Sequence, residues 1–176
     1  MQKSLVHLYF GDGKGKTTAA VGLGLRAYGR GKRVLLVQFL KNYDSGEILA
    51  LEHLSDSFQI LKGEPVKKFF AGMTEAEKQT TVRLQHQMFM KAVEAARSEK
   101  FNMVIFDELV DAVNLEIVGI KEIENFIKTK ADGLEVVITG HHPKPEFLEL
   151  CDYVTEMKKI KHPFDQGVCA RIGIEK

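Results

Sequence analysis

The stretch Gly11–Thr18, GDGKGKTT, limits what this chain can fold into more than any other feature of the sequence. It follows an apolar run, 5–10, and it opens a segment with helical spacing, 16–30. A strand, a glycine-rich turn and a helix in this order are the setting that a phosphate-binding loop requires. Glycines let successive backbone N–H groups converge on an anion, and the free amides and positive dipole end of the helix add to the attraction. The pattern therefore predicts a site for a phosphate-bearing ligand.

One detail departs from the usual phosphate loop. That loop has four residues between its first glycine and the Gly-Lys pair, whereas three residues separate Gly11 from Gly15 here. Lys16 is still placed to reach phosphate oxygens, and the Thr17 hydroxyl is still placed to bind magnesium. The residues leave two alternatives: a chance match, or a shortened loop with its own way of holding a nucleotide.

The composition limits the classes of protein to which the chain can belong. Its 176 residues predict one domain spanning 1–176, and its net charge of +1 gives no bulk attraction for nucleic acid. No apolar run approaches the ~20 residues that cross a bilayer, and residues 1–4 do not form a signal-peptide pattern. The only cysteines, Cys151 and Cys169, lack metal-binding spacing. We therefore expect a cytoplasmic protein with free thiols that binds neither nucleic acid nor a membrane.

Strand-like and helix-like segments alternate along the chain. Strands are predicted at 5–10, 33–39, 58–61, 103–108, 134–139, 153–157 and 168–174, and helices at 16–30, 47–54, 74–99, 121–130 and 146–151. Thr74 and Glu77 form a capping box at the start of the longest helix. The alternation predicts an α/β fold with a mainly parallel central sheet.

The apolar run at 103–106 ends in two carboxylates, Asp107 and Glu108. A carboxylate at the carboxyl end of a strand that lies beside the phosphate-loop strand can hold magnesium directly or through water. Taken alone, a strand that simply ends in polar residues is the better interpretation. Together with Gly11–Thr18, the two carboxylates favour a nucleoside triphosphate site.

No residue is an unmistakable general base for a phosphotransferase or an NTPase. His141 and His142 follow a predicted strand end, and they either face the site or lie exposed in a loop. His7 and His86 fall inside regular elements, where packing or surface roles are more typical.

Two further features allow both a binding and a structural role. Arg26 lies ten residues beyond Lys16 on the predicted helix, so it either reaches a ligand or covers the sheet with its stem. Phe69-Phe70 either anchors a loop into the core or stacks on a large flat ligand.

The chain resembles the ATP:corrinoid adenosyltransferases of the CobA/BtuR type along nearly its whole length. The resemblance rests on GDGKGKTTAA at 11–20, VQFLK at 37–41, FDEL at 106–109, VITG at 137–140, DYVTEM at 152–157 and, most specifically, KHPFDQGVCARIGIE at 161–175. It implies the three-layer P-loop NTPase (RecA-like) form of the α/β fold.

The resemblance also implies a reaction. Co(I) of a reduced corrinoid (cobalamin, cobinamide or cobyrinate diamide) attacks the 5′ carbon of ATP, and triphosphate leaves. Such a nucleophile carries no proton, so the chemistry needs no general base. The protein aligns cobalt with C5′ and stabilises the leaving charge with backbone amides, Lys14, Lys16 and a Mg²⁺ (or Mn²⁺) on Thr17 and Glu108. In the family, ATP is thought to lie reversed relative to ordinary phosphate-loop enzymes.

Site residues follow from the resemblance position by position. Arg26 is implied as a ribose or nucleotide contact, Glu108 with Asp107 as metal ligands, and Phe69 and Phe70 as neighbours of the corrinoid. The implied phosphate-binding residues are Gly11, Asp12, Gly13, Lys14, Gly15, Lys16, Thr17 and Thr18. A homodimer and a reduced flavoprotein or similar electron donor are the implied partners.

The sequence departs from the family pattern at two places. The usual Thr-Gly-Arg is Thr139-Gly140-His141 here, which replaces a permanent cation with a titratable one. Many members have a longer segment before the first strand that can fold over the site. Two alternatives to the transferase are kept: a phosphotransferase or NTPase, and a nucleotide-dependent corrinoid carrier without turnover.

Overall fold

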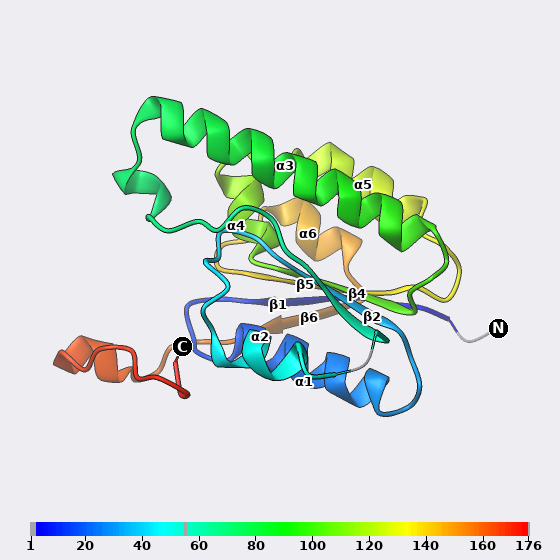
Figure 1. Cartoon of the computed structure of the whole chain (residues 1–176), viewed down its shortest axis with the longest axis horizontal. Coiled ribbons are helices and arrows are strands. Elements are labelled where there is room, and N and C mark those ends of the chain that lie inside the picture. The colour runs from blue at the N-terminus through cyan, green and yellow to red at the C-terminus, as the bar shows by residue number, and fades with distance from the viewer. Residues whose placement is uncertain (1–2, 55, 176) are drawn as a thin grey trace.

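Six parallel strands form the sheet on which the rest of the chain is built (Figure 1). The computed structural model describes residues 3–54 and 56–175. The strands are β1 (Val6–Phe10), β2 (Val34–Gln38), β3 (Phe58–Leu61), β4 (Met103–Asp107), β5 (Glu135–Gly140) and β6 (Tyr153–Glu156). The predicted α/β fold with a parallel sheet is confirmed.

Helices cover both faces of the sheet (Figure 1). One face carries α1 (Lys16–Tyr28) and α2 (Gly46–Leu51), and the other carries α3 (Glu75–Arg97), α4 (Leu109–Asn114), α5 (Ile120–Lys128) and α6 (Pro145–Leu150). Because side chains alternate along a strand, Leu35 and Val37 pack into the core under α3–α6, while Val34 and Leu36 pack under α1 and α2. Every residue of β2 and β4 is buried, which explains their nearly unbroken apolar runs.

The strand order β3-β2-β4-β5-β1-β6 corrects one expectation. The strand that ends in Asp107 was expected beside the phosphate-loop strand, but β5 lies between β4 and β1. The alternation of strands and helices predicts crossovers without fixing how many sheet positions each crossover passes. The carboxyl ends of the adjacent strands β4, β5 and β1 therefore lie side by side.

The elements agree with the sequence predictions to within a few residues, except at 109–114 and near the C-terminus. The capping box at Thr74 and Glu77 begins α3 as predicted. The strand predicted at 168–174 is wrong, because these residues form no strand and lie exposed. Edge strand β6 exposes every one of its residues, including the apolar Tyr153 and Val154, and within the described residues no further strand pairs with it. Helix α4, directly after the two carboxylates, was not predicted.

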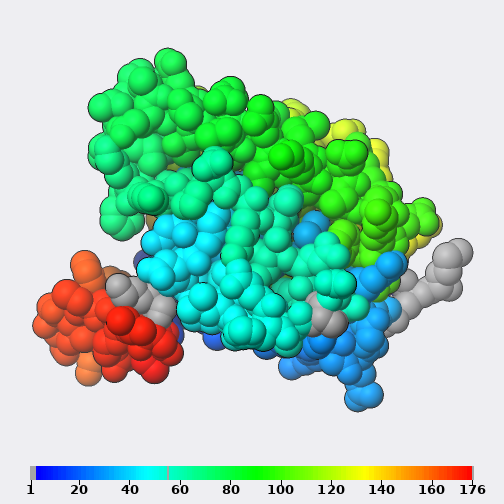
Figure 2. Space-filling view, in the orientation of Figure 1, coloured from blue at the N-terminus to red at the C-terminus, as the bar shows by residue number. Residues whose placement is uncertain are grey.

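The C-terminal tail, residues 158–175, projects from the body as a separate lobe (Figure 2). It contains one 3-10 turn, Pro163–Gln166, and exposes large apolar side chains, including Ile160 at 85%, Phe164 at 70% and Ile172 at 86%. No helix in the described part of the chain combines the length and apolarity needed to cross a membrane.

Candidate functional site

The glycine-rich loop runs from the end of β1 to the start of α1, as predicted. Gly11 and Gly15 have φ of 109° and 110°, in a region that side chains rarely adopt, and Gly15 is the N-cap of α1. A β-carbon on Gly13 would lie 2.5 Å from the Met157 carbonyl oxygen. The glycines are therefore required both by the turn and by the close approach of a neighbouring segment.

That neighbouring segment fixes the loop through the backbone. The Gly13 N–H donates to the Met157 carbonyl at 2.6 Å, and the Met157 N–H donates to the Phe10 carbonyl at 2.7 Å. The Gly11 N–H donates to the His141 carbonyl at 3.0 Å. The residues that follow β5 and β6 thus set the shape of the loop. The part played by Met157 was not predicted, because it acts through its backbone, which is the same whatever the side chain.

Lys16 lies across the loop. Its ammonium group donates to the carbonyls of Gly11 at 2.6 Å and Gly13 at 3.0 Å, and the residue is 9% exposed. A buried ammonium needs acceptors, and two loop carbonyls supply them. This arrangement places a positive charge at the converging loop, where phosphate oxygens would provide stronger, charged acceptors.

Asp107 links the loop to the neighbouring strands. Its side chain is fully buried, and its Oδ1 accepts hydrogen bonds from the Thr17 hydroxyl at 2.9 Å and the Thr139 hydroxyl at 2.7 Å. Its Oδ2 accepts from the Gln38 amide at 3.0 Å. Thr17, in the first turn of α1, therefore contacts Asp107 directly although β5 lies between β1 and β4, and Thr139 on β5 donates to the same carboxylate oxygen. Hydroxyl and carboxylate oxygens are the ligands that Mg²⁺ prefers.

Glu108 sits next to this network in a left-handed conformation, with φ of 62°, as the N-cap of α4. Its N–H donates to the Thr139 hydroxyl at 2.9 Å, and the Lys41 ammonium donates to its Oε1 at 3.1 Å. Burial raises the pKa of Glu108 to about 7, although the Lys41 charge acts in the opposite direction. A carboxyl group with such a pKa exchanges its proton readily near neutral pH.

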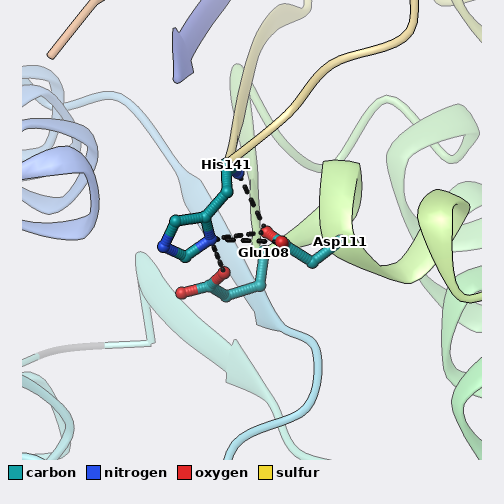
Figure 3. A group of neighbouring side chains, drawn as sticks. All are labelled: Glu108, Asp111 and His141. Carbon is teal, nitrogen blue, oxygen red and sulfur yellow. Dashed lines mark hydrogen bonds and ion pairs between the residues drawn. The ribbon is translucent and has the colours of Figure 1, made fainter. Parts of the chain in front are cut away.

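His141 faces the same carboxylate, which decides between its two sequence interpretations (Figure 3). Its Nδ1 lies 3.1 Å from Asp111 Oδ1 and 3.7 Å from Glu108 Oε2. The hydrogen bond with Asp111 raises the pKa of His141 despite partial burial. Burial alone would raise the pKa of Asp111, but the hydrogen bonds from His141 and Glu108 outweigh it and lower that pKa. His142 is exposed.

The three side chains in Figure 3 also have the geometry of a cation site. One ligand atom from each of Glu108, Asp111 and His141 lies within 4.8 Å of the others. Asp111 was missed from the sequence because it follows Glu108 on α4, the helix that was not predicted. Glu108 is thus shared between Lys41 on one side and this group on the other.

Left-handed backbone occurs at the same edge of the sheet, as it also does at Glu99 after α3 and Glu116 after α4. Leu40 and Tyr43, in the loop after β2, have φ of 57° and 61°, and Glu108 after β4 has 62°. Non-glycine residues in this region are uncommon and are typical of functional sites. The Tyr43 hydroxyl stabilises its loop by donating to the Gln38 carbonyl at 3.3 Å and accepting from the Gly63 N–H at 2.8 Å.

The other predicted contacts lie farther from the loop. Arg26 is exposed in the last turn of α1, ten residues and thus about 15 Å along the helix from Lys16, and its contact with a nucleotide stays a prediction. Phe69 is 94% exposed, while Phe70 packs against the core and lies 5.9 Å from the Lys78 ammonium. Their predicted role beside a corrinoid also remains untested.

A cavity of about 550 Å³ lies between the loop after β3 and the first half of α3. Its walls combine apolar side chains, among them Pro65, Met73 and Leu84, with charged and polar ones, among them Lys67 and Gln85. The Gln85 side chain also accepts a hydrogen bond from the Leu40 N–H at 3.0 Å. The cavity is therefore connected to the strained loop that follows β2.

Comparisons with known proteins agree with the sequence signature. A family model described as ATP:corrinoid adenosyltransferase BtuR/CobO/CobP matches residues 2–175. A corrinoid adenosyltransferase of Escherichia coli K12 is 33% identical over 175 residues, covering 99% of this chain and 86% of the relative. The corrinoid adenosyltransferase CobA of Salmonella typhimurium is 32% identical over 179 residues, with 99% and 86% covered. The chain belongs to the ATP:corrinoid adenosyltransferase family.

Proposed function

We propose that this chain transfers the 5′-deoxyadenosyl group of ATP to Co(I) of a reduced corrinoid and releases triphosphate. Family membership over residues 2–175 supports the reaction class. The structural observation that carries the proposal is the meeting of the short glycine-rich loop, Lys16 and Thr17 with Asp107 at the carboxyl edge of the sheet. This constellation suits a triphosphate, and the Co(I) nucleophile carries no proton that a general base would have to remove.

The chemistry requires alignment and charge stabilisation. The electron pair of Co(I) forms the new bond to C5′, the C5′–O bond breaks, and its electrons leave with the triphosphate. Negative charge therefore stays on the triphosphate, where loop amides, Lys14 and Lys16 would stabilise it. Gly11–Thr18 are the proposed phosphate-binding residues, with Arg26 as a proposed nucleotide contact. The reversed orientation of ATP remains part of the proposal.

A magnesium ion belongs to this proposal, with manganese as a substitute. The oxygens of Thr17, Asp107 and Glu108 match the donors that Mg²⁺ takes, and a bound ion would neutralise charge on the triphosphate. The fully buried Gln38 Oε1 supports the fit, because it has no hydrogen-bond partner within the described residues. Thr17 now donates to Asp107, and it would turn its oxygen lone pair toward the ion.

We propose that the corrinoid lies against Phe69 and the adjacent cavity. An aromatic ring that is 94% exposed beside a partly apolar cavity supports contact with a large flat ligand. Phe70 would act from beneath as an anchor, since it packs against the core. A reduced flavoprotein or similar protein is the proposed source of the electron for Co(I).

The fold type, the oligomeric state and the cellular compartment also belong to the proposal. The three-layer arrangement with a phosphate loop after β1 supports a P-loop NTPase fold of the RecA-like type. The exposed apolar side chains of the tail support a homodimer. Two unpaired cysteines suit the reducing cytoplasm.

Product analysis with ATP, magnesium and chemically reduced cobalamin tests the function. The proposal expects triphosphate and the light-sensitive cobalt–carbon product in equal amounts over many turnovers. ADP and phosphate would instead identify a phosphotransferase or NTPase. Product that stops below one equivalent per site would identify a corrinoid carrier.

A further inference from the structure

Gln38 is a polar residue at the end of a completely buried strand. It closes β2, and its side chain is fully buried. Its Nε2 donates to Asp107 Oδ2 at 3.0 Å, but its Oε1 has no partner among the described residues. Buried amide groups are nearly always paired. This acceptor is the one buried side-chain nitrogen or oxygen without a hydrogen bond in the part of the chain that the structure describes.

The orientation of the Gln38 amide follows from its neighbour. The Asp107 carboxylate accepts hydrogen bonds from Thr17 and Thr139 on Oδ1, as an ionised carboxylate does. Turning the amide over would bring the glutamine oxygen against Asp107 Oδ2 and place two acceptors together. The NH₂ group must therefore face Asp107, and the oxygen is the atom left without a partner.

The unpaired Gln38 Oε1 needs a hydrogen-bond donor, and the proposed magnesium site can supply one. The nearest cationic side chain on the same loop, Lys41, donates to Glu108 instead. Mg²⁺ keeps several of its waters when it binds to proteins, and each such water is a donor. Removing a group that hydrogen-bonds a metal ligand typically weakens metal binding by roughly 10–100-fold.

We propose that Gln38 is a positioning residue of the magnesium site, whose N–H holds Asp107 and whose Oε1 accepts a hydrogen bond from a water on the ion. This inference rests on the proposed function for the presence of the ion. It also assigns a role to a residue of the VQFLK segment at 37–41, which is part of the family resemblance but was given no function from the sequence. Gln38 does not touch the reacting atoms.

The first test uses Gln38→Met, which keeps the length of the side chain and removes the amide. Mn²⁺ binding to the ATP complex is measured by electron paramagnetic resonance, and ATP binding without metal by equilibrium dialysis. We expect ~10–100-fold weaker Mn²⁺ binding with metal-free ATP affinity within about twofold of the wild type. Gln59→Met is the matched control, since Gln59 lies exposed on neighbouring β3, where its side-chain amide donates to the Asp56 carbonyl.

A second measurement needs no substitution. In ¹⁵N-labelled wild-type protein with ATP, Mn²⁺ should broaden the side-chain NH₂ resonance of Gln38 well before that of Gln59. Equal broadening of the two resonances, or Mn²⁺ affinity unchanged in Gln38→Met, would overturn the inference. Both readouts are independent of turnover. Mn²⁺ affinity that depends on Gln38, in a wild-type protein that forms no adenosylated corrinoid, would contradict the proposed function alone.

Discussion

The phosphate loop, residues 11–18, is held by bonds to distant parts of its own chain and buries Gly11, Gly13 and Lys16, whereas the C-terminal tail, residues 158–175, is almost wholly exposed. Backbone bonds from Met157 and His141 hold the loop, and Lys16 closes over it. Side-chain bonds of the tail stay local, such as Lys159 to Asp165 and Arg171 to Glu175. Both segments carry family-specific residues.

This difference in burial indicates that the two segments have their specific residues for different reasons. The glycines and Lys16 of the loop make contacts within one chain, including the close approach of Met157 to Gly13. The tail has no such explanation, because Phe164 and Ile172 bury little of their surface. We infer that the tail residues serve contacts with a second molecule, and the predictions below test each side of this comparison.

Lys16→Ala should have the largest effect, a loss of ~10²–10³-fold in adenosyl transfer, because it removes a cation that stabilises the leaving charge. The fold should persist, since the two bonds of the ammonium go only to loop carbonyls. Steady-state product formation and circular dichroism measure the two effects. Lys32→Ala, at an exposed lysine after α1, is the control. Transfer within tenfold of the wild type would remove Lys16 from the mechanism.

Glu108→Gln should reduce transfer by ~10²-fold and should stabilise the protein at alkaline pH. Burial raises the pKa of Glu108 from 4.5 to about 7, so the folded state binds this proton more tightly than the unfolded state. Folding therefore loses stability as the pH rises from 4.5 through 7, and a neutral glutamine escapes this loss.

Urea unfolding at pH 5 and pH 8.5 measures that difference. The variant should exceed the wild type by on the order of 2 kcal/mol at the higher pH and by little at the lower one. Lower stability of the variant at both values would show that Glu108 contributes to folding rather than opposing it.

The tail should contribute to association and not to folding of the single chain. The double substitution Phe164→Asp and Ile172→Asp is expected to convert a dimer to a monomer in analytical ultracentrifugation. The free energy of unfolding of the monomer should change by less than ~0.5 kcal/mol, as is typical of surface substitutions. Leu49→Asp, which changes a leucine on α2 that is 56% exposed, is the control. A wild-type monomer, or a dimer that survives the double substitution, would contradict this role.

His141→Asn should change the free energy of unfolding by the smallest amount, and the change should depend on pH. The bond with Asp111 raises the pKa of His141 above 6.5, so its stabilisation is complete below pH 6.5 and disappears as the pH rises through the folded pKa. The lowered pKa of Asp111 removes the same contribution under acid conditions, below 3.8. The pair is partly exposed, which limits the effect to less than ~1 kcal/mol. A stability difference from the wild type that grows between pH 6 and 9 would reverse this assignment.

The sequence predicted the parts of the site that depend on residue type and local spacing. Gly11–Thr18 formed the expected strand–loop–helix unit, and Asp107 lies at a strand end as expected. Sequence patterns did not predict that β5 separates β4 from β1, because topology depends on how each crossover packs. Three residues that contact Asp107 or Glu108 in the folded chain were given no role from the sequence. They are Asp111, Gln38 and Lys41, and their contacts depend on strands and loops that are far apart in the sequence. The strand predicted at 168–174 failed because apolar alternation does not supply a strand to pair with.

Met157 gives the comparison between loop and tail a thermodynamic consequence. This residue lies between the end of β6 and the start of the tail, and its carbonyl accepts the Gly13 N–H of the phosphate loop. Linkage is reciprocal: if a molecule docked on the tail changes the affinity of the loop for ATP, ATP changes the affinity of the tail for that molecule by the same factor. The Met157 carbonyl thus connects the nucleotide-binding loop to the tail, and through it ATP binding can be coupled to association of the tail with another molecule.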